Sequence, residues 1–557
     1  MKELITIELV TKNGMKIIQE FQGIQLYEVA EKYYGKEDGL TPIFARVDDR
    51  GWDLLHHLNR SCRVEFMDMS TRLGRMTYQR TIYFLFKVAL HEIAPHLSCA
   101  LRFPLNDGIL IELQGERKKD GSLAWEIEKR MRELIASGVR FQRRILRREE
   151  ILGPDRPELI TDYLLDLVAN CDVQEIFEYE YEGFRELFFD PLMESPGSLD
   201  VFEIVPYHGN IIIRVPNFGN PTGLREYRDD ILLYKSFEKT SAWRQNVEVD
   251  YIGDLNRKVN SGAWRDLILV CEAYHEKKIA LIADEFMASG KRIILIAGPS
   301  ASGKTTFAQR LCIQLRVNGF RPLYMGTDDY FLERNEMARD ENGKLDFENI
   351  SAVDVDLFNK HLNMLLNGEE VDIPVFDFIS GSKRYGTRIT RAQADQPIVI
   401  EGIHALNPEL TSKIDKDVKF SIYISPLTVL NIDEDNRIPM TDLRLLRRMA
   451  RDIRSRDRSA ALTLKQWPDV RRGEEKNIFP YIGQSDTLFN STLTYELAVL
   501  KPLVLPSLQA ISKKEDVYLE AERLIRVLRC VRSVEDTSMI MSNSIIREFI
   551  GGGMWVQ

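Results

Sequence analysis

At 557 residues the chain is too long for one hydrophobic core, and we expect about three or four domains. Its 44% hydrophobic and 29% charged residues, without any low-complexity tract, are ordinary for a globular protein. A net charge of −10 argues against broad nonspecific nucleic-acid binding by the whole molecule.

The sequence also bears on the compartment. Six scattered cysteines with no C-x-x-C pair favour reduced thiols over disulfides or a zinc site. The opening MKELITIELV has the alternation of a strand, which does not resemble a signal peptide, and no apolar stretch has the length of a membrane span. We therefore expect a cytoplasmic protein with no membrane contact, and we expect it to form a homo-oligomer.

Residues 1–68 are predicted to form a small β-rich unit. The alternating stretches ITIELVT and MKIIQEF flank Lys12-Asn13-Gly14, and Asn-Gly between two such stretches is a strong hairpin signal. LYEVAEKYYG has helical spacing and ends at a glycine suited to a C-cap. IFARVDD and CRVEFMDM are two further strand candidates, and together these elements make a β-grasp-like pattern.

Residues 69–235 are predicted to be an α+β domain. YQRTIYFLFKVALHEIA has the pattern of a buried helix and WEIEKRMRELIASG that of an amphipathic one. VFEIVPYHGNIIIRVPN predicts a strand pair that turns at His208-Gly209-Asn210. Residues 236–290 are predicted to be a mainly helical connector that stops at Gly290.

Residues 291–530 alternate apolar strand-like runs with helices, which indicates an α/β domain built on a parallel sheet. The overall fold class is thus α/β multidomain. Residues 531–557 form a tail whose segment SNSIIREFIGGG is either an amphipathic docking helix or a strand-like end.

The stretch IAGPSASGKTT has the phosphate-loop spacing G-x-x-x-x-G-K-T, between the strand-like RIILIA and the helical TTFAQRLCIQLRVNG. A glycine-rich turn before a helix aims unpaired N–H groups at an anion, and we expect that anion to be ATP. Lys304 would supply positive charge to the β- and γ-phosphates, and Thr305 a hydroxyl to Mg²⁺. The expected nucleotide contacts in this loop are Gly298, Ser300, Ala301, Ser302, Gly303, Lys304, Thr305 and Thr306.

Two acidic residues follow predicted strands of the same domain. Asp328 comes directly after PLYMGT, where a carboxylate could reach an acceptor hydroxyl, although this position taken alone is better explained by a plain polar turn. Glu401 ends the apolar run in QPIVIEG, where an unpaired carboxylate is costly. We therefore expect Glu401 to hold Mg²⁺ together with Thr305.

Two further patterns leave alternatives open. The helix LRLLRRMARDIRSRDR carries Arg444, Arg448 and Arg451 along one face, which is either a solvated basic face or an arginine lid over transferring phosphates. In IPVFDFISGSKR, Phe376 and Phe378 lie on the same side of an extended segment. They are either core residues or the walls of a site for a flat ring.

The motifs GPSASGKTT, DDYF, IPVFDF, EGI and RRMARDI resemble, in order, those of uridine–cytidine kinase within the phosphoribulokinase/uridine kinase group, over about 291–510. The resemblance implies an ATP- and Mg²⁺-dependent kinase that phosphorylates a nucleoside 5′-hydroxyl, with Asp328 as the base and Lys304 and Arg456 as further catalytic residues. The positions it implies at the sugar are Glu348, Arg448 and Gln466, and those at the phosphates are Arg451 and Arg456.

The chain departs from that family around the base. Phe376 stands where the pyrimidine kinases have tyrosine, and Gly381 where they have histidine. A site that loses two polar groups no longer reads the base edge in the same way. The resemblance implies that Phe376 and Phe378 stack a base, and Gly381 would leave space for a larger ring.

Residues 1–235 resemble the front end of threonyl-tRNA synthetase, with a TGS-like unit at 1–68 followed by a region like the synthetase's second additional domain. The whole layout resembles a bacterial group of fused uridine kinase-like proteins. Two alternatives to a nucleoside kinase remain. One is a kinase of a sugar phosphate or another small alcohol. The other is an RNA-binding or regulatory protein that uses nucleotide binding as a switch, with RNA contacted by the N-terminal region.

Overall fold

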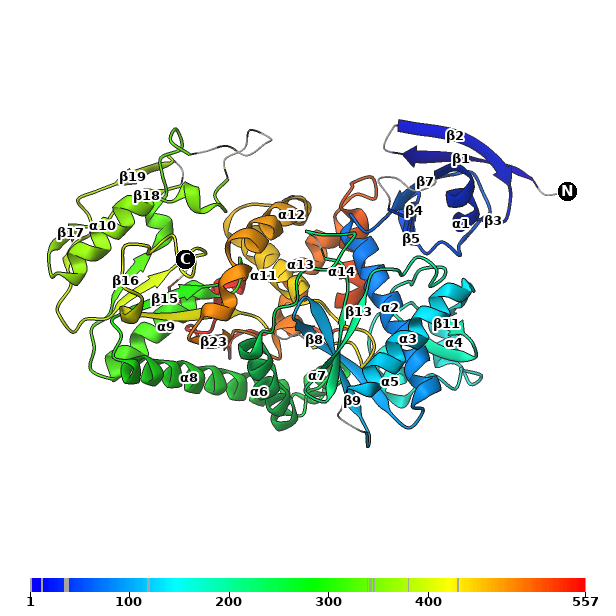
Figure 1. Cartoon of the computed structure of the whole chain (residues 1–557), viewed down its shortest axis with the longest axis horizontal. Helices are drawn as coiled ribbons and strands as arrows, with labels where there is room; N and C mark the ends of the chain where they lie inside the picture. The colour runs from blue at the N-terminus through cyan, green and yellow to red at the C-terminus, as the bar shows by residue number, and fades with distance from the viewer. Residues whose placement is uncertain are drawn as a thin grey trace.

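The computed structural model describes the chain apart from residues 1–2, 12–13, 35–39, 118–120, 218, 338, 340–342, 344–345, 379, 428–429 and 556–557, and the side chain of Ser241. The N-terminal sheet and a parallel sheet lie at opposite ends of the molecule, with a group of helices between them (Figure 1). Within the described residues, no helix is both long and apolar enough to cross a bilayer.

The N-terminal unit is a mixed sheet of order β2-β1-β7-β4-β5. β1 pairs in parallel with β7 and antiparallel with β2, and its alternating Ile5, Ile7 and Leu9 are buried. The expected strands are confirmed, whereas Lys12, Asn13 and the C-cap Gly35 lie outside the described residues. The elements are β1 Leu4–Thr11, β2 Gly14–Phe21, β3 Ile24–Gln25, α1 Leu26–Val29, the π-helix Ala30–Tyr34, β4 Phe44–Val47, β5 Arg50–Trp52, β6 His57–Leu58 and β7 Cys62–Met67.

The next region packs two antiparallel sheets, β13-β14-β9-β8 and β10-β11-β12, against long helices. The expected buried helix, amphipathic helix and strand pair are confirmed, and the pair turns at His208 and Gly209, both with positive φ. The elements are α2 Arg72–Ile93, β8 Ser98–Leu105, β9 Gly108–Gln114, α3 Ser122–Ser137, β10 Gln142–Arg147, α4 Arg148–Leu152, α5 Asp162–Asn170, β11 Glu175–Tyr181, β12 Phe184–Phe188, β13 Glu203–Tyr207 and β14 Asn210–Arg214.

The connector is helical as predicted. Its last helix ends at Gly290, which adopts the left-handed conformation that closes a helix without strain. The helices are α6 Ile231–Val247, α7 Ile252–Ser261 and α8 Trp264–Ser289.

The predicted parallel sheet is confirmed, with order β16-β21-β15-β22-β23 and every described pairing parallel. β15, which precedes the phosphate loop, lies at its centre and is buried throughout. The strands are β15 Ile293–Ala297, β16 Leu323–Gly326, β21 Ile398–Glu401, β22 Lys419–Ser425 and β23 Thr487–Asn490. Four short strands form two antiparallel pairs, the hairpin of β18 with β19 and the pair of β17 with β20 that encloses it in sequence: β17 Glu370–Asp372, β18 Val375–Asp377, β19 Ser382–Arg384 and β20 Ile389–Arg391.

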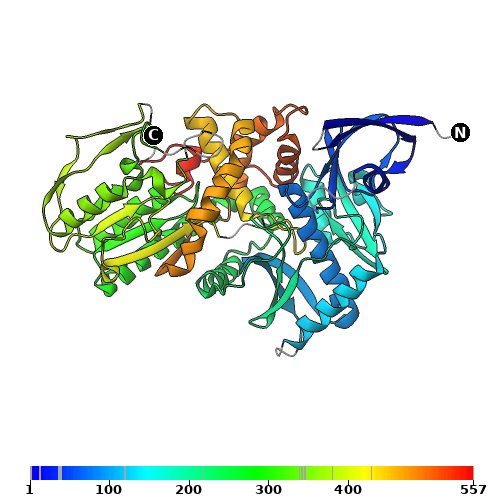
Figure 2. The same ribbon diagram turned by 45° about the horizontal axis from the view of Figure 1, so that its top comes forward.

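Helices α11 to α14 lie between the two halves (Figures 1 and 2). One continuous apolar core joins residues of the second region, the connector and the parallel-sheet region, so their packing is shared. The remaining helices are α9 Lys304–Val317, α10 Val355–Leu366, α11 Met440–Ser455, α12 Ala460–Asn477, α13 Glu496–Gln509, α14 Tyr518–Arg529 and α15 Arg547–Ile550. The 3₁₀ turns are Thr327–Tyr330, Ile350–Ala352, Lys416–Val418 and Phe479–Gln484.

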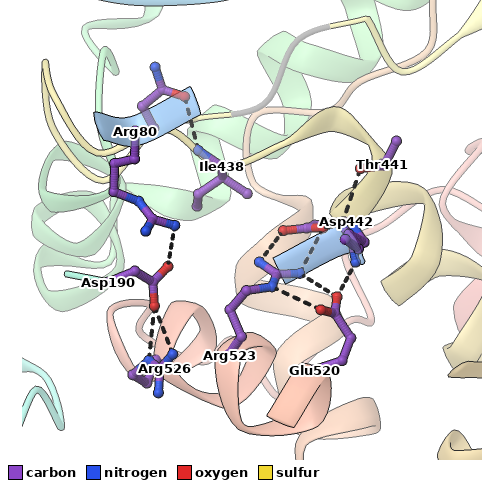
Figure 3. Close-up of polar contacts among 10 residues, drawn as sticks. Arg80, Asp190, Ile438, Thr441, Asp442, Glu520, Arg523 and Arg526 are labelled. Atoms are coloured by element: carbon purple, nitrogen blue, oxygen red, sulfur yellow. Dashed lines mark hydrogen bonds and ion pairs between the residues drawn. The ribbon is translucent and has the colours of Figure 1, made fainter. Parts of the chain in front are cut away.

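Ion pairs fasten the N-terminal half to these helices (Figure 3). Asp442, fully buried in the first turn of α11, receives two hydrogen bonds from Arg523 of α14, at 2.7 and 2.9 Å, and also binds Arg72 of α2. Beside this cluster, Asp190 binds Arg526 at 2.8 Å and Arg80 at 3.3 Å. Although burial opposes ionisation, Arg523 and Arg72 lower the pKa of Asp442.

Candidate active site

The phosphate loop is shaped by two glycines and one strained alanine. A β-carbon at Gly298 would lie 2.0 Å from the Ile424 carbonyl oxygen, so only glycine lets β22 approach this closely. Gly303, at the entrance of α9, has φ of +88°. Ala301 has φ of +59°, a left-handed conformation that costs a non-glycine residue about 1 kcal/mol or more. The loop geometry therefore overrides a local backbone preference.

Lys304, Thr305 and Glu401 meet at the end of the central strands. The Thr305 hydroxyl lies 3.4 Å from Glu401 Oε2, and the Tyr324 hydroxyl donates to the same oxygen at 3.1 Å. Burial raises the pKa of Glu401 to about 7, and the Asp328 carboxylate adds to the shift. A carboxylate in this state is stabilised by a nearby cation, so a hydroxyl and an acid side by side suit Mg²⁺.

Asp328 follows β16 in the 3₁₀ turn and its side chain is accessible to solvent. Displacement of water by the surrounding protein raises the pKa of Asp328, whereas the positive charges of Lys304 and Arg456 lower it. The neighbouring Asp329 does not share this environment, because it binds Arg388 at 2.6 Å and accepts from the Phe376 N–H at 3.4 Å. Of the two acids, only Asp328 is available to a substrate.

Phe376 and Phe378 pack edge to face at 5.1 Å, with Phe376 buried and Phe378 52% exposed. Phe331 joins both rings at 5.7 and 6.0 Å, and also packs on Phe347. Phe376 therefore belongs to the core, whereas Phe378 presents an aromatic surface to solvent. Phe331 and Phe347 were not expected here, although Phe331 lies in the motif DDYF, three residues after Asp328, and Phe347 directly precedes Glu348.

The expectation that Gly381 leaves space for a larger ring is wrong. A β-carbon at Gly381 would lie 2.4 Å from Cδ of Arg334, whose side chain fills the position, and Gly381 has φ of +71°. The Arg334 backbone N–H also donates to the Gly381 carbonyl at 3.1 Å. The Arg334 side chain thus fills the space beside Gly381.

Glu348 faces α12, and its backbone carbonyl accepts from the Asn477 amide at 2.7 Å. Burial raises the pKa of Glu348 to about 7, with Glu474 adding to the shift. The predicted partner Gln466 lies elsewhere: it is about 10 Å along α12 from Gly473, the residue that touches Glu348. Its hydrogen-bond partner is Arg458 at 3.4 Å, so the structure does not bring Gln466 to Glu348.

The interpretation of α11 as a solvated basic face is wrong, because most of the helix is buried. Arg448, Arg451 and Arg456 share the single buried carboxylate of Asp452, at 3.3 to 3.5 Å. Arg448 also donates to the Ser300 hydroxyl at 2.9 Å, which fastens it to the phosphate loop. Three arginines on one acid leave a surplus of positive charge beside the loop, which suits phosphate.

Glu474 is a site residue that sequence analysis missed. It is fully buried, binds Arg444 at 2.5 and 2.7 Å, and accepts the Ser300 backbone N–H at 3.1 Å. Although burial opposes ionisation, Arg444 and Arg471 lower its pKa. Nothing in the run RRGEEKN distinguishes this acid from its neighbours, so no local signal could have identified it.

The tail docks on the phosphate loop, and the strand-like alternative for it is wrong. α15 packs against α11 with Phe549 fully buried. A β-carbon at Gly303 would lie 2.4 Å from Ile545, so the tail touches the loop directly. Glu548 accepts a hydrogen bond from the Thr306 hydroxyl. A short helix of mixed polarity gives little indication of this contact in sequence.

A phosphate loop, strand-end acids and an arginine-bearing helix around one point define a P-loop phosphotransferase. The profile described as "Phosphoribulokinase / Uridine kinase family" matches residues 293–498. A uridine kinase of Halalkalibacterium halodurans is 30% identical over 185 residues, which cover 33% of this chain and 78% of that protein. A uridine kinase of Anoxybacillus flavithermus is 29% identical over 180 residues, covering 32% and 76%.

Among solved structures, that of "a Possible Uridine Kinase from Bacillus stearothermophilus" is 20% identical, covers 38% of this chain and 97% of its own, and has a TM-score of 0.27. The sequence matches establish that the chain belongs to the phosphoribulokinase/uridine kinase family. It is a kinase, a phosphotransferase with an alcohol acceptor.

Proposed function

We propose that the protein is an ATP-dependent nucleoside kinase, similar to uridine and cytidine kinases, that transfers the γ-phosphate to a nucleoside 5′-hydroxyl. The observation that carries the proposal is the position of Asp328. It is a solvent-accessible carboxylate at the end of β16, within electrostatic reach of Lys304 and Arg456. That arrangement places a proton acceptor beside the cations that hold phosphate.

In this proposal Asp328 takes the proton of the acceptor hydroxyl while the hydroxyl oxygen attacks the γ-phosphorus of ATP. The bond between the γ-phosphorus and the β,γ-bridging oxygen breaks, and ADP leaves. Lys304 and Arg456 stabilise the negative charge on the transferring phosphoryl oxygens, and Arg451 adds to the same field. The backbone N–H groups of residues 298–306 hold the donor phosphates. Thr305 and Glu401 would hold Mg²⁺, which would supply charge neutralisation between the β- and γ-phosphates.

The acceptor would lie against the exposed ring of Phe378, beside Phe376, with its ribose hydroxyls donating to ionised Glu348. The hydrogen bond from Arg448 to the Ser300 hydroxyl would keep the Arg448 side chain close to the sugar. Three aromatic rings favour a planar base over a sugar phosphate, which would need additional cations at this point. Arg334, in place of the histidine ring, would give this pocket its own base preference.

The test is a phosphorylation assay with ATP, Mg²⁺ and a panel of purine and pyrimidine nucleosides and sugar phosphates. We expect a nucleoside 5′-monophosphate as product, and a loss of kcat by about a hundredfold or more in Asp328→Asn with ATP binding retained. Asp356→Asn, which removes an exposed carboxylate paired with Lys413, is the matched control. Full activity in D328N would refute the assignment of the base. Turnover of sugar phosphates alone would favour the alternative acceptor.

For the N-terminal region we propose the synthetase-like architecture, a TGS-like unit followed by a domain like the second additional domain. The parallel pairing of β1 with β7 inside an otherwise antiparallel sheet supports the first part. If this region contacts RNA, the protein should bind tRNA, and the logarithm of the binding constant should fall linearly with the logarithm of salt concentration. No binding at low salt would exclude it. A homo-oligomer remains a prediction, which light scattering tests.

A further inference from the structure

A small cavity of about 40 Å³ lies between the connector helices and the end of the parallel sheet, and its lining contains no residue proposed for the active site. α6 contributes Thr240, Trp243 and Arg244, α8 contributes Tyr274, and β23 contributes Asn490. The Trp243 and Tyr274 rings stack at 4.0 Å and form an aromatic wall. By volume the cavity holds more than one water-sized group but is too small for a nucleotide.

Arg244 is the unusual member of this lining. Its residue is 7% exposed, and it makes no hydrogen bond or ion pair through its side chain with any residue that the structure describes. Other buried arginines of this chain do not resemble it, because Arg447 and Arg523 each bind a buried carboxylate. Burial, together with Arg102, lowers the pKa of Arg244. A buried guanidinium without a counter-charge is energetically costly.

Asp250 and Glu112 raise the pKa of Arg244 through space, but neither forms an ion pair with it among the described residues. Glu496 lines the cavity, but it is bound by Arg447 at 2.6 Å and by the Leu493 N–H at 2.9 Å. Arg102, whose positive charge lowers the pKa of Arg244, forms an ion pair with Glu112. Arg244 therefore lines this small space without a directly bonded counter-charge among the described residues.

We propose that this cavity binds a small oxyanion of phosphate or carboxylate type, held by charge-assisted hydrogen bonds from the Arg244 guanidinium. A guanidinium presents several parallel N–H donors, which match the oxygens of such an anion. The Asn490 amide donates to the Thr240 hydroxyl at 3.4 Å, and that hydroxyl donates to the Ser236 carbonyl at 3.0 Å, so these groups make the lining polar while Arg244 is the charged donor. The aromatic wall excludes water on the other side and strengthens the charge interaction.

The site is joined to the phosphate loop by one short segment. After Asn490, the Ser491 hydroxyl donates to the Ser302 carbonyl at 2.6 Å, and Arg447 holds the Ser491 carbonyl at 2.7 Å. An oxyanion bound at Arg244 would therefore stabilise the segment around Ser491, which is hydrogen-bonded to the phosphate loop. The inference does not depend on which alcohol is phosphorylated, so it can fail or succeed independently of the proposed function.

The experiment titrates the full chain with inorganic phosphate at constant ionic strength and follows thermal unfolding. The variant is Arg244→Met, and the matched control is Lys239→Met, which removes an exposed positive charge from the same helix. Phosphate also binds the phosphate loop, so both proteins should respond. At a phosphate concentration about tenfold above Kd, we expect the melting temperature of K239M to rise by about 1 °C more than that of R244M. Without phosphate, R244M should be no less stable than K239M.

A second measurement serves if R244M does not fold. Trp243 adjoins Arg244, so the fluorescence difference between wild type and Trp243→Phe should change with phosphate, and Lys304→Ala should retain that change. Equal phosphate responses in R244M and K239M would overturn the proposal. So would a Trp243 signal that phosphate leaves unaltered, since the cavity would then hold only water.

Discussion

The Glu548 carboxylate accepts a hydrogen bond from the Thr306 hydroxyl at 3.0 Å and lies 3.4 Å from the Thr306 backbone nitrogen. Thr306 belongs to the first turn of α9, where free N–H groups and the helix dipole favour an anion. A carboxylate from near the end of the chain thus occupies a position suited to a nucleotide phosphate.

We predict that Glu548→Gln strengthens ATP binding about threefold to tenfold, because it removes a negative charge that competes with phosphate at the helix N-terminus. Calorimetric titration with a non-hydrolysable ATP analogue measures the change. Glu535→Gln, an exposed acid of the same tail, should have no effect. Weaker binding by E548Q would mean that Glu548 supports the nucleotide instead of opposing it.

Ala301→Gly should stabilise the protein by about 0.5 to 1 kcal/mol, since glycine adopts a φ of +59° without the steric cost that alanine bears. Urea unfolding of the two proteins measures the difference. Ala308→Gly provides a control of opposite sign, because Ala308 is buried within helix α9 and should cost about 1 kcal/mol or more. A loss of stability in both variants would contradict the strain at Ala301.

Glu348 should make acceptor binding depend on pH. With its pKa raised to about 7, ionised Glu348 is scarce at pH 6 and abundant at pH 8, so the acceptor KM should fall about tenfold between them. Glu348→Gln should remove this dependence. Because the folded-state pKa lies above the ordinary 4.5, the same group should make the substrate-free protein lose stability as pH rises from about 4.5 to 7. A stability profile identical in E348Q would contradict the shift.

Arg523→Met should destabilise the protein by about 3 to 5 kcal/mol, because Asp442 would keep its buried charge with Arg72 as its remaining partner. Chemical denaturation measures the loss. The double variant R523M with Asp442→Leu should recover much of it, since the uncompensated charge is then absent. If the double variant were as unstable as R523M, shape and not charge would govern this contact.

Gly381→His should not restore the polar group that the related kinases have at this position. Histidine at a φ of +71° is strained, and its ring would collide with Arg334. We expect lower stability and a higher acceptor KM than in the wild type. Combining it with Arg334→Ala should relieve the collision, and a fully active G381H would show that Arg334 moves aside freely.

The parts of the site carried by contiguous motifs could be predicted from sequence. The phosphate loop, the strand-end Glu401 and Asp328 follow from local patterns, because parallel strands end at one edge and bring their acids together. Partners supplied by distant segments could not be predicted. Glu474 and Glu548 lie 174 and 242 residues from the loop residues they bind, and Arg334 fills Gly381 through a loop conformation that no periodicity encodes.

The link between Arg72 and the end of the chain also sets an order of events during synthesis. Arg72 binds Glu520, 448 residues later, so at about 5 to 20 residues per second the partner emerges about 20 to 90 s after Arg72 itself. Throughout that interval the face of α2 that will meet α14 is without its native cover. The nascent protein must therefore keep its N-terminal half soluble until residue 520 has been synthesised, and the Glu548 contact with the phosphate loop can form only after that.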